Sequence, residues 1–146
     1  MQKKRAIFLD RDGTINEEVG YIERLDSLRI IPEAYEAIRL INVSSFMAVV
    51  VTNQAGVAKG LFNEAFVKQT NERLQEFLRQ KGAAIDAFYF CPHHPTEGVP
   101  PYRRVCDCRK PAPGLFYQAA RDMAIDLAAS YMIGDRYRDM EAAHRA

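Results

Sequence analysis

The sequence predicts an α/β fold in which a mostly parallel sheet carries helices on both faces. Four short apolar runs, each the length of a buried strand, alternate along the chain with helical patterns of apolar residues. Three of these runs are followed by small polar or acidic residues, and folds of this class bind ligands beyond the carboxyl ends of their strands. The chain has 146 residues, of which 48% are hydrophobic, so it is long enough to bury one ordinary core.

The first half of the chain contains two of the predicted strands. Residues 5–10 are an apolar run that ends in an acidic residue, and residues 46–51 are a second apolar run. Between them, residues 14–31 are polar and mixed, which predicts a long loop. A helix then begins at Pro32, because proline is tolerated at a first helical position. Its apolar residues share one face and are Ala34, Ala37, Ile38 and Ile41.

A longer helix and a third strand follow. Asn63 can cap a helix that runs to about Lys81 and stops at Gly82. The apolar residues of this helix are Phe66, Leu74, Phe77 and Leu78. Residues 85–90 predict the third strand. Residues 91–112, called here the cysteine loop, hold five of the seven prolines and all three cysteines. An irregular segment of this length in a compact domain is unusual unless something holds it.

The last part of the chain completes the alternation. Pro113 begins a helix that is expected to reach about Leu127, and residues 130–133 form the fourth strand. From Tyr137 onward the pattern is helical to the end of the sequence. No internal repeat or linker interrupts the chain, so we expect one domain over residues 1–146. The final helix should lead into a further strand.

Charge and composition exclude several classes of protein. Twenty Lys and Arg against nineteen Asp and Glu leave a net charge of +1, which argues against a strongly basic nucleic-acid-binding protein. No apolar run approaches the roughly 20 residues that span a bilayer. The basic residues 1–5 soon meet further charged residues and do not form a signal peptide. We therefore expect a cytoplasmic protein without a nucleic-acid or membrane partner.

Polar side chains at the predicted strand ends suggest phosphate chemistry. Carboxylates held close together repel one another unless a cation neutralises them, and Mg²⁺ prefers such oxygen ligands. Hydroxyl and amide groups at a turn can accept phosphate oxygens, and a lysine adds positive charge. An isolated Asp-x-Asp is also explained by a turn that uses Asp to satisfy local N–H groups. The residues concerned are Asp10, Asp12, Thr52, Asn53, Lys110 and Asp135.

This ordered set resembles the haloacid dehalogenase superfamily of phosphatases over nearly the whole chain. The matching motifs are Asp-Arg-Asp-Gly-Thr at residues 10–14, Thr-Asn at 52–53, Lys110, and Gly-Asp at 134–135 with Asp139. The resemblance implies a Rossmann-like sheet. The predicted loops leave no room for a separate cap domain, so the site should be open and suited to a small, freely diffusing sugar phosphate.

The same resemblance implies the role of each motif residue. Asp10 would attack phosphorus and form an aspartyl-phosphate, and Asp12 would protonate the leaving oxygen and then activate water. Mg²⁺ would bind Asp10, Asp135 and the backbone carbonyl of Asp12. The transferring phosphoryl group would be held by Thr52, Asn53 and Lys110. Asp139 lies four residues after Asp135, so it either faces the site from the first helical turn or is a plain surface residue.

The cysteine loop predicts a second metal site. Cys91, Cys106 and Cys108 with one histidine supply the ligands of a tetrahedral zinc ion, which would hold the loop. Because the cysteines are odd in number and no export signal precedes them, a metal site fits better than a disulfide framework. Spacing alone does not choose between His93 and His94. Three unrelated buried thiols are the alternative explanation.

The loop also narrows the resemblance within the superfamily. Cys-Pro-His-His-Pro at residues 91–95 and Cys-Asp-Cys-Arg-Lys-Pro at 106–111 resemble the branch of D-glycero-D-manno-heptose 1,7-bisphosphate 7-phosphatases. That branch implies Cys91, His93, Cys106 and Cys108 as structural zinc ligands. The long insert at residues 96–105, together with residues 20–22 and 51–54, favours it over the related histidinol-phosphate phosphatases.

Three arginines of the cysteine loop are candidates for phosphate binding. Arg109 can hold a phosphate through two parallel hydrogen bonds, or it can form a surface ion pair. Arg103 and Arg104 can meet a second phosphate, but a solvated loop is the favoured explanation for both. We expect Arg109 and Lys110 to point at the substrate because zinc fixes the loop before them.

The expected function is Mg²⁺-dependent hydrolysis of the 7-phosphate of D-glycero-D-manno-heptose 1,7-bisphosphate. We expect the enzyme to be a monomer. The reaction would belong to the carbohydrate metabolism that serves lipopolysaccharide biosynthesis. Histidinol-phosphate hydrolysis is the nearest alternative. A receiver-like phospho-switch also uses Asp, Mg²⁺, Thr and Lys, but it needs neither Asp12 nor a zinc loop. A zinc-stabilised module without activity is a further alternative, because family members typically continue past the last motif with another strand and helix, whereas this sequence ends at Ala146.

Overall fold

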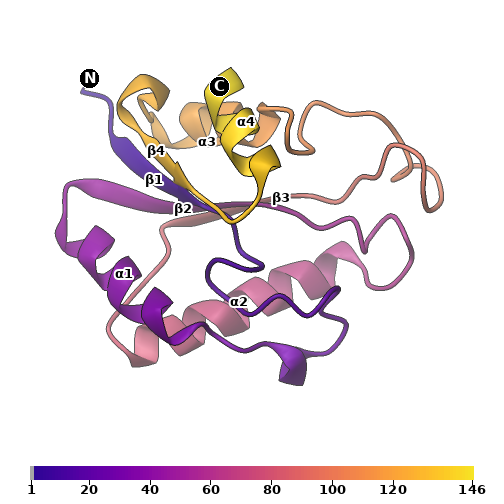
Figure 1. Ribbon diagram of the computed structural model, residues 1–146, viewed down its shortest axis with the longest axis horizontal. Helices are drawn as coiled ribbons and strands as arrows, with labels where there is room; N and C mark the ends of the chain where they lie inside the picture. The colour runs from indigo at the N-terminus through magenta and orange to yellow at the C-terminus, as the bar shows by residue number, and fades with distance from the viewer. Residues whose placement is uncertain (1) are drawn as a thin grey trace.

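The computed structural model describes residues 2–146, and within them four parallel strands form one sheet in the order β3-β2-β1-β4 (Figure 1). The strands are β1 (Arg5–Leu9), β2 (Phe46–Asn53), β3 (Ala87–Cys91) and β4 (Tyr131–Ile133). Every pairing between neighbours is parallel. The predicted α/β class with a parallel sheet is therefore confirmed, and the connections between strands contain helices, as parallel pairing requires.

Helices cover both faces of the sheet, two on each face (Figure 1). On one face lie α1 (Pro32–Val43) and α2 (Glu64–Gln80), and on the other lie α3 (Gly114–Met123) and α4 (Tyr137–Arg145). Two short 3₁₀ helices complete the described elements, η1 (Leu25–Ser27) and η2 (Leu127–Ala129). None of the helices within residues 2–146 combines the length and apolar composition needed to cross a bilayer.

The core is divided by the sheet into two layers. Side chains alternate across a strand, so Val50 packs with the α1 and α2 side whereas Val49 and Val51 pack with the α3 and α4 side. All three valines are fully buried. β2 is thus covered on both faces, which explains why its sequence is a continuous apolar run rather than an alternating one.

The strand register brings three carboxyl ends together. Leu9 of β1 lies opposite Val50 of β2 on one side and Ile133 of β4 on the other. The N–H of Asp10 continues this pairing by donating to the carbonyl of Ile133 at 3.0 Å. Residues that follow β1, β2 and β4 therefore emerge at one edge of the sheet.

Two helices differ from the sequence prediction in detail. The α3 helix ends at Met123, not near Leu127, because Ala124 adopts a left-handed conformation with φ of 54° and the chain turns back toward β1. There the N–H of Asp126 donates to the carbonyl of Lys4 at 2.7 Å. In α1, Ala37 is exposed, and half-buried Tyr35 packs against the core instead. The predicted cap of α2 is confirmed, since Asn63 Oδ1 accepts the Phe66 N–H at 2.8 Å.

The strand boundaries also shift. β2 extends to Asn53, so Thr52 and Asn53 are strand residues and not part of a turn. Their pairing explains the extension, because Thr52 lies opposite Phe90 and Asn53 opposite Cys91. β1 and β3 end one residue from their predicted limits, at Leu9 and Cys91. In α2, Phe66 and Phe77 are only half-buried, whereas Leu74 and Leu78 are fully buried as predicted.

Candidate active site and metal centre

A pocket of about 270 Å³ lies at the edge of the sheet where β1 and β2 end. Its walls come from the loop after β1, from the end of β2 and from the start of α4. Of the predicted site residues, four line it directly: Asp10, Asp12, Thr52 and Asn53. The other lining residues are Glu18, Gly20, Tyr21, Gln54, Arg136 and Arg138. The polar residues at the ends of β1 and β2 thus share one cavity, whereas Asp135, which follows β4, is not among the residues that line it.

Lys110 lies beneath this pocket, between two carboxylates. Only 1% of its side chain is exposed, and its Nζ donates to Asp10 Oδ1 at 2.9 Å and to Asp139 Oδ1 at 2.5 Å. A third hydrogen bond runs from Nζ to the carbonyl of Val51 at 2.9 Å. All three ammonium donors are therefore satisfied, which is the condition for burying such a charge.

The side chain of Asn53 holds Lys110 in place by bonding to the backbone of the lysine. The Asn53 Oδ1 accepts the Lys110 N–H at 2.9 Å, and Asn53 Nδ2 donates to the Lys110 carbonyl at 3.1 Å. Both ends of the amide are used in this reciprocal pair. Asn53 therefore connects the end of β2 to the segment that delivers Lys110, although it also lines the pocket. Thr52 is buried beside it and accepts a hydrogen bond from Gln54 Nε2 at 3.0 Å.

Asp139 is fully buried, so it is not the surface residue that one interpretation of the sequence allowed. Besides bonding to Lys110, its Oδ2 accepts the N–H of Arg136 at 3.1 Å and so caps α4. A Cβ on Gly134 would lie 2.4 Å from this oxygen, so the close approach of Asp139 requires glycine there. Asp139 is thus both a helix cap and one of the two carboxylates that neutralise Lys110.

Burial raises the pKa of the Asp10 carboxyl above its ordinary value. The neighbouring Lys110 ammonium opposes this shift, and the Asp139 carboxylate reinforces it. Asp10 Oδ1 accepts hydrogen bonds from Lys110 and from the N–H of Arg11, the latter at 2.9 Å. Oδ1 is thus held on the protein side, which leaves Oδ2 as the oxygen available to a ligand or to an electrophile.

Three carboxylates could hold a cation here. Asp10, Asp135 and Asp139 each offer one oxygen, and these oxygens lie within 4.8 Å of one another. A Cβ on Gly13 would lie 2.3 Å from Asp135 Oδ2, and the φ of +85° at Gly13 also favours glycine. The bare backbone of the loop after β1 therefore lets the Asp135 carboxylate approach. Hard oxygen donors at this separation fit Mg²⁺. These residues, Asp10, Asp12, Asp135, Asp139 and Lys110, are called here the acidic edge.

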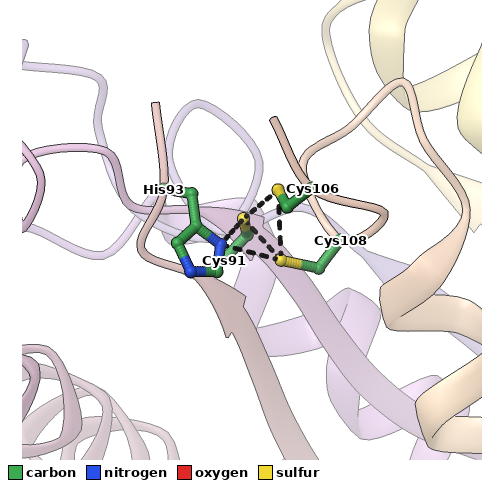
Figure 2. Close-up of side chains that lie close together, drawn as sticks. All are labelled: Cys91, His93, Cys106 and Cys108. Carbon is green, nitrogen blue, oxygen red and sulfur yellow. Dashed lines mark hydrogen bonds between the residues drawn. The ribbon is translucent and has the colours of Figure 1, made fainter. Parts of the chain in front are cut away.

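The second cluster is formed by Cys91, His93, Cys106 and Cys108, whose side chains point toward one another from two segments of the chain (Figure 2). Around one zinc ion, pairs of thiolate ligands stand roughly 3.8 Å apart and nitrogen–sulfur pairs about 3.6 Å. The sulfur of Cys106 lies 3.6 Å from those of Cys91 and Cys108, and His93 Nδ1 lies 3.5 and 3.4 Å from the same two sulfurs. The sulfurs of Cys91 and Cys108 lie much closer to each other than two thiolate ligands of one zinc ion would, at 2.7 Å.

The donor set has the chemistry of a tetrahedral metal site. The contact between the two closest thiols raises the pKa of Cys91 and lowers that of Cys108 to about 6. Thiolates are the ligands that zinc binds, so this donor set suits a zinc ion. His94 lies outside the cluster, where its Nδ1 accepts the N–H groups of Thr96 and Glu97. Of the two histidines that spacing leaves open, His93 is the one that lies in the cluster.

Two of the three arginines of the cysteine loop donate to carbonyls of the same loop. Arg109 Nη1 donates to the carbonyl of His93 at 3.2 Å, which ties this residue to the cysteine cluster. Arg103 and Arg104 are exposed, and Arg103 Nη1 bonds to the carbonyl of Gly98 at 3.3 Å. None of the three is among the residues that line the pocket within residues 2–146. Arg136 and Arg138 are the arginines that do line it.

Sequence reasoning missed the residues that surround Asp12. Its carboxylate accepts hydrogen bonds from Arg11, Asn16 and Gln54. Asn16 and Arg11 are almost fully buried, as is Gln54. A buried polar side chain that follows a strand end can be suspected from position alone, but its partner depends on the folded path of residues 10–16. Only the adjacent Arg11 carried a signal, as a charged residue between two aspartates.

Comparison with known proteins places the chain among phosphatases. Residues 107–146 match the HAD-hydrolase-like family. A protein of Escherichia coli O6:H1 named D-glycero-beta-D-manno-heptose-1,7-bisphosphate 7-phosphatase is 47% identical over 141 residues, which is 97% of this chain and 74% of that protein. A protein of Yersinia pestis with the same name is 44% identical over 142 residues, or 97% of this chain and 76% of its own length.

Solved structures agree with these relatives. A putative HAD-like phosphatase from Mesorhizobium loti superposes with a TM-score of 0.93 at 37% identity, covering 98% of this chain and 68% of the other. The D,D-heptose 1,7-bisphosphate phosphatase from B. bronchiseptica, solved with magnesium and phosphate, has a TM-score of 0.85 at 34% identity and covers 97% and 75% of the two chains.

Proposed function

The chain belongs to the D-glycero-β-D-manno-heptose-1,7-bisphosphate 7-phosphatase family of HAD-like hydrolases, and from that premise we propose that it hydrolyses the 7-phosphate of D-glycero-D-manno-heptose 1,7-bisphosphate. It is a phosphoric monoester hydrolase. The observation that carries the proposal is the acidic edge itself. Asp10 and Asp12 line one pocket, and the lysine and two aspartates that lie close to Asp10 come from segments a hundred residues or more further along the chain.

Magnesium is the proposed cation of the acidic edge, and the B. bronchiseptica relative was solved with magnesium and phosphate. We propose that Asp10, Asp135 and the backbone carbonyl of Asp12 hold it. When bound, the ion neutralises charge on the phosphoryl oxygens. Asp139 is close enough to contribute, but its two oxygens already accept hydrogen bonds from Lys110 and Arg136. Its proposed role is therefore to hold Lys110 in place.

The nucleophile of the proposed reaction is Asp10 Oδ2. Because Lys110 and the Arg11 N–H hold Oδ1, the other oxygen can face phosphorus without turning the carboxylate. Attack forms an aspartyl-phosphate as the bond to the sugar oxygen breaks, and Asp12 gives that oxygen a proton. Water then releases inorganic phosphate from Asp10, and its proton returns to Asp12. Thr52, Asn53 and Lys110 are the proposed holders of the phosphoryl group.

Zinc is the proposed ion of the cysteine cluster, bound by Cys91, His93, Cys106 and Cys108. Four protein ligands leave no open coordination position, so its role is structural. It would fix the segment that leads to Arg109 and Lys110. We retain Arg109 as a phosphate-binding residue, because only one of its guanidinium nitrogens is engaged, with His93. Thiolate ligation suits a reducing compartment, and we propose a cytoplasmic monomer that meets its small substrate by diffusion.

Phosphate release from purified protein with Mg²⁺ tests the proposal. The substrate panel contains D-glycero-D-manno-heptose 1,7-bisphosphate, the corresponding 1-phosphate and histidinol phosphate. We expect the bisphosphate to lose one phosphate per molecule and the 1-phosphate to lose none. Faster release from histidinol phosphate would contradict the proposed substrate but keep the chemistry. No release from any of the three would contradict the proposed activity itself.

A further inference from the structure

Arg11 is the largest fully buried side chain within residues 2–146, and only 2% of it is exposed. Its guanidinium has two partners. Nε and Nη2 each donate to Asp12 Oδ1 at 3.1 Å, and Nη1 donates to Asn71 Oδ1 on α2 at 3.0 Å. A buried guanidinium is costly unless it is paired and hydrogen-bonded, so these two partners account for its presence in the interior.

Arg11 lies behind Asp12 as seen from the pocket. The pocket is lined by Asp12 but not by Arg11 or Asn71 among the described residues, and 20% of the Asp12 side chain is exposed. Arg11 therefore has no access to a phosphate in the pocket. It acts on whatever occupies the pocket only through the carboxylate of Asp12.

The two oxygens of Asp12 are in different surroundings. Oδ1 accepts three N–H donors, two from Arg11 and one from Asn16 Nδ2 at 2.9 Å. Oδ2 accepts one, from Gln54 Nε2 at 3.1 Å. A carboxylate oxygen offers about two lone-pair sites, so Oδ1 has no room for a proton whereas Oδ2 has. The proton of the acid form of Asp12 must accordingly be carried by Oδ2.

We propose that Arg11 is a positioning residue, which is anchored by Asn71 and turns Asp12 so that Oδ2 carries the transferred proton. The inference rests on the proposed function. As Asp10 bonds to phosphorus, the bond from phosphorus to the sugar oxygen breaks, its electron pair stays on that oxygen, and the proton of Oδ2 is transferred to it. In the second step water bonds to phosphorus, its proton goes to Oδ2, and the bond to Asp10 breaks. Each turnover consumes one water and restores Asp12.

A purely structural role makes a different prediction. Arg11 also ties the loop after β1 to α2, and loosening that tie would slow every substrate alike. If Asp12 is misplaced, hydrolysis slows most for the substrate whose leaving-group oxygen most needs a proton. A sugar alkoxide is a strong base and needs one, whereas the p-nitrophenolate ion is a much weaker base and leaves without one.

The experiment compares kcat/KM for the heptose bisphosphate and for p-nitrophenyl phosphate in Arg11→Lys and in the unaltered enzyme. The value of kcat/KM reports only the steps up to expulsion of the leaving group. The later role of Asp12 in activating water therefore does not affect it. Lysine keeps the charge but loses the planar fork that reaches Asp12 and Asn71 together. We expect kcat/KM to fall roughly 100-fold for the bisphosphate, the scale of general acid catalysis, and less than about 5-fold for p-nitrophenyl phosphate.

Two further variants keep the test decisive if Arg11→Lys does not fold. Asn71→Leu removes the acceptor that anchors Arg11 and should show the same selective loss of kcat/KM for the bisphosphate. Asn71→Asp keeps an acceptor for Arg11 and should therefore retain most of the kcat/KM that Asn71→Leu loses. Arg73→Lys is the matched control, because Arg73 lies on the same helix, is 46% exposed, and contacts Glu76 and the Phe77 ring, not Arg11 or Asp12. Equal losses on both substrates would overturn the inference. An unaltered enzyme that releases no phosphate would instead overturn the proposed function.

Discussion

The acidic edge and the cysteine loop can each hold a metal ion, but the chain organises them in different ways. The ligands of the acidic edge follow β1 and β4, about 125 residues apart in sequence, and are aligned because those strands pair in register. The ligands of the cysteine loop lie within residues 91–108, mostly outside regular structure. The sheet positions the whole first set, whereas of the second set it positions only Cys91, the last residue of β3.

This difference predicts how each site fails. Loss of a group from the acidic edge should remove activity and leave most of the fold intact, unless the group is the buried lysine. Loss of a ligand from the cysteine loop should remove stability first and activity only as a consequence. The predictions below run from the largest expected effect to the smallest.

Asp10→Asn should abolish turnover, because an amide oxygen is a poor nucleophile and cannot form the aspartyl-phosphate. Steady-state phosphate release from the heptose bisphosphate measures the effect, which should exceed about a thousandfold. Asp26→Asn is the matched control, since Asp26 is exposed and pairs only with Arg24. Measurable turnover by Asp10→Asn at the level of the control would contradict nucleophilic catalysis at this position.

Lys110→Met should impair both activity and stability, which distinguishes it from Asp10→Asn. Removing the ammonium leaves Asp10 and Asp139 as uncompensated buried carboxylates, and breaking a buried pair in this way costs about 3–5 kcal/mol. Urea denaturation in the absence of added metal measures the free energy of unfolding. The double variant with Asp139→Leu should recover part of that loss. An unchanged denaturation midpoint for Lys110→Met would show that the buried network contributes little.

His93→Gln should lower zinc content and thermal stability more than it lowers kcat, and Cys106→Ser should behave in the same way. Elemental analysis of freshly purified protein and thermal melting measure the two quantities. His94→Gln is the matched control. The His94 ring accepts N–H groups of the loop and pairs with Glu97, and it lies outside the cysteine cluster. Equal zinc content in the two histidine variants would refute the assignment of His93, and unaltered protein without zinc would refute the site.

Glu97→Gln should have the smallest effect. Its carboxylate is exposed and lies 3.1 Å from Lys59 Nζ, and surface pairs of this kind contribute little to stability. Lys59 lowers the pKa of Glu97 below 4.5, so the contribution of the pair is present above that value and is lost as the pH falls through the lowered pKa. Melting curves of the variant and the unaltered protein should therefore differ slightly at pH 7 and converge as the pH falls through the lowered pKa. A loss at pH 7 as large as that of His93→Gln would mean that ion pairs, not the metal, hold the loop.

The regular elements were predictable because their signals are local. The apolar run of β2, the proline at the start of α1 and the Asn63 cap of α2 each depend on neighbouring residues only. Errors occurred where distant contacts decide the outcome. Pairing with β3 extends β2 through Asn53, and the return of the chain toward Lys4 ends α3 at Met123.

The sequence alone specifies which chemical groups are available and in what order. These groups are the acidic motifs, the lysine and the four zinc-type ligands. The partners of those groups were decided only by the tertiary structure. Lys110 meets Asp139, and Arg11 turns inward to Asn71, because the sheet order and the packing of α2 and α4 bring together residues that are 29 and 60 positions apart. Electrostatic partners at such separations depend on the folded path of the chain, which no local pattern encodes.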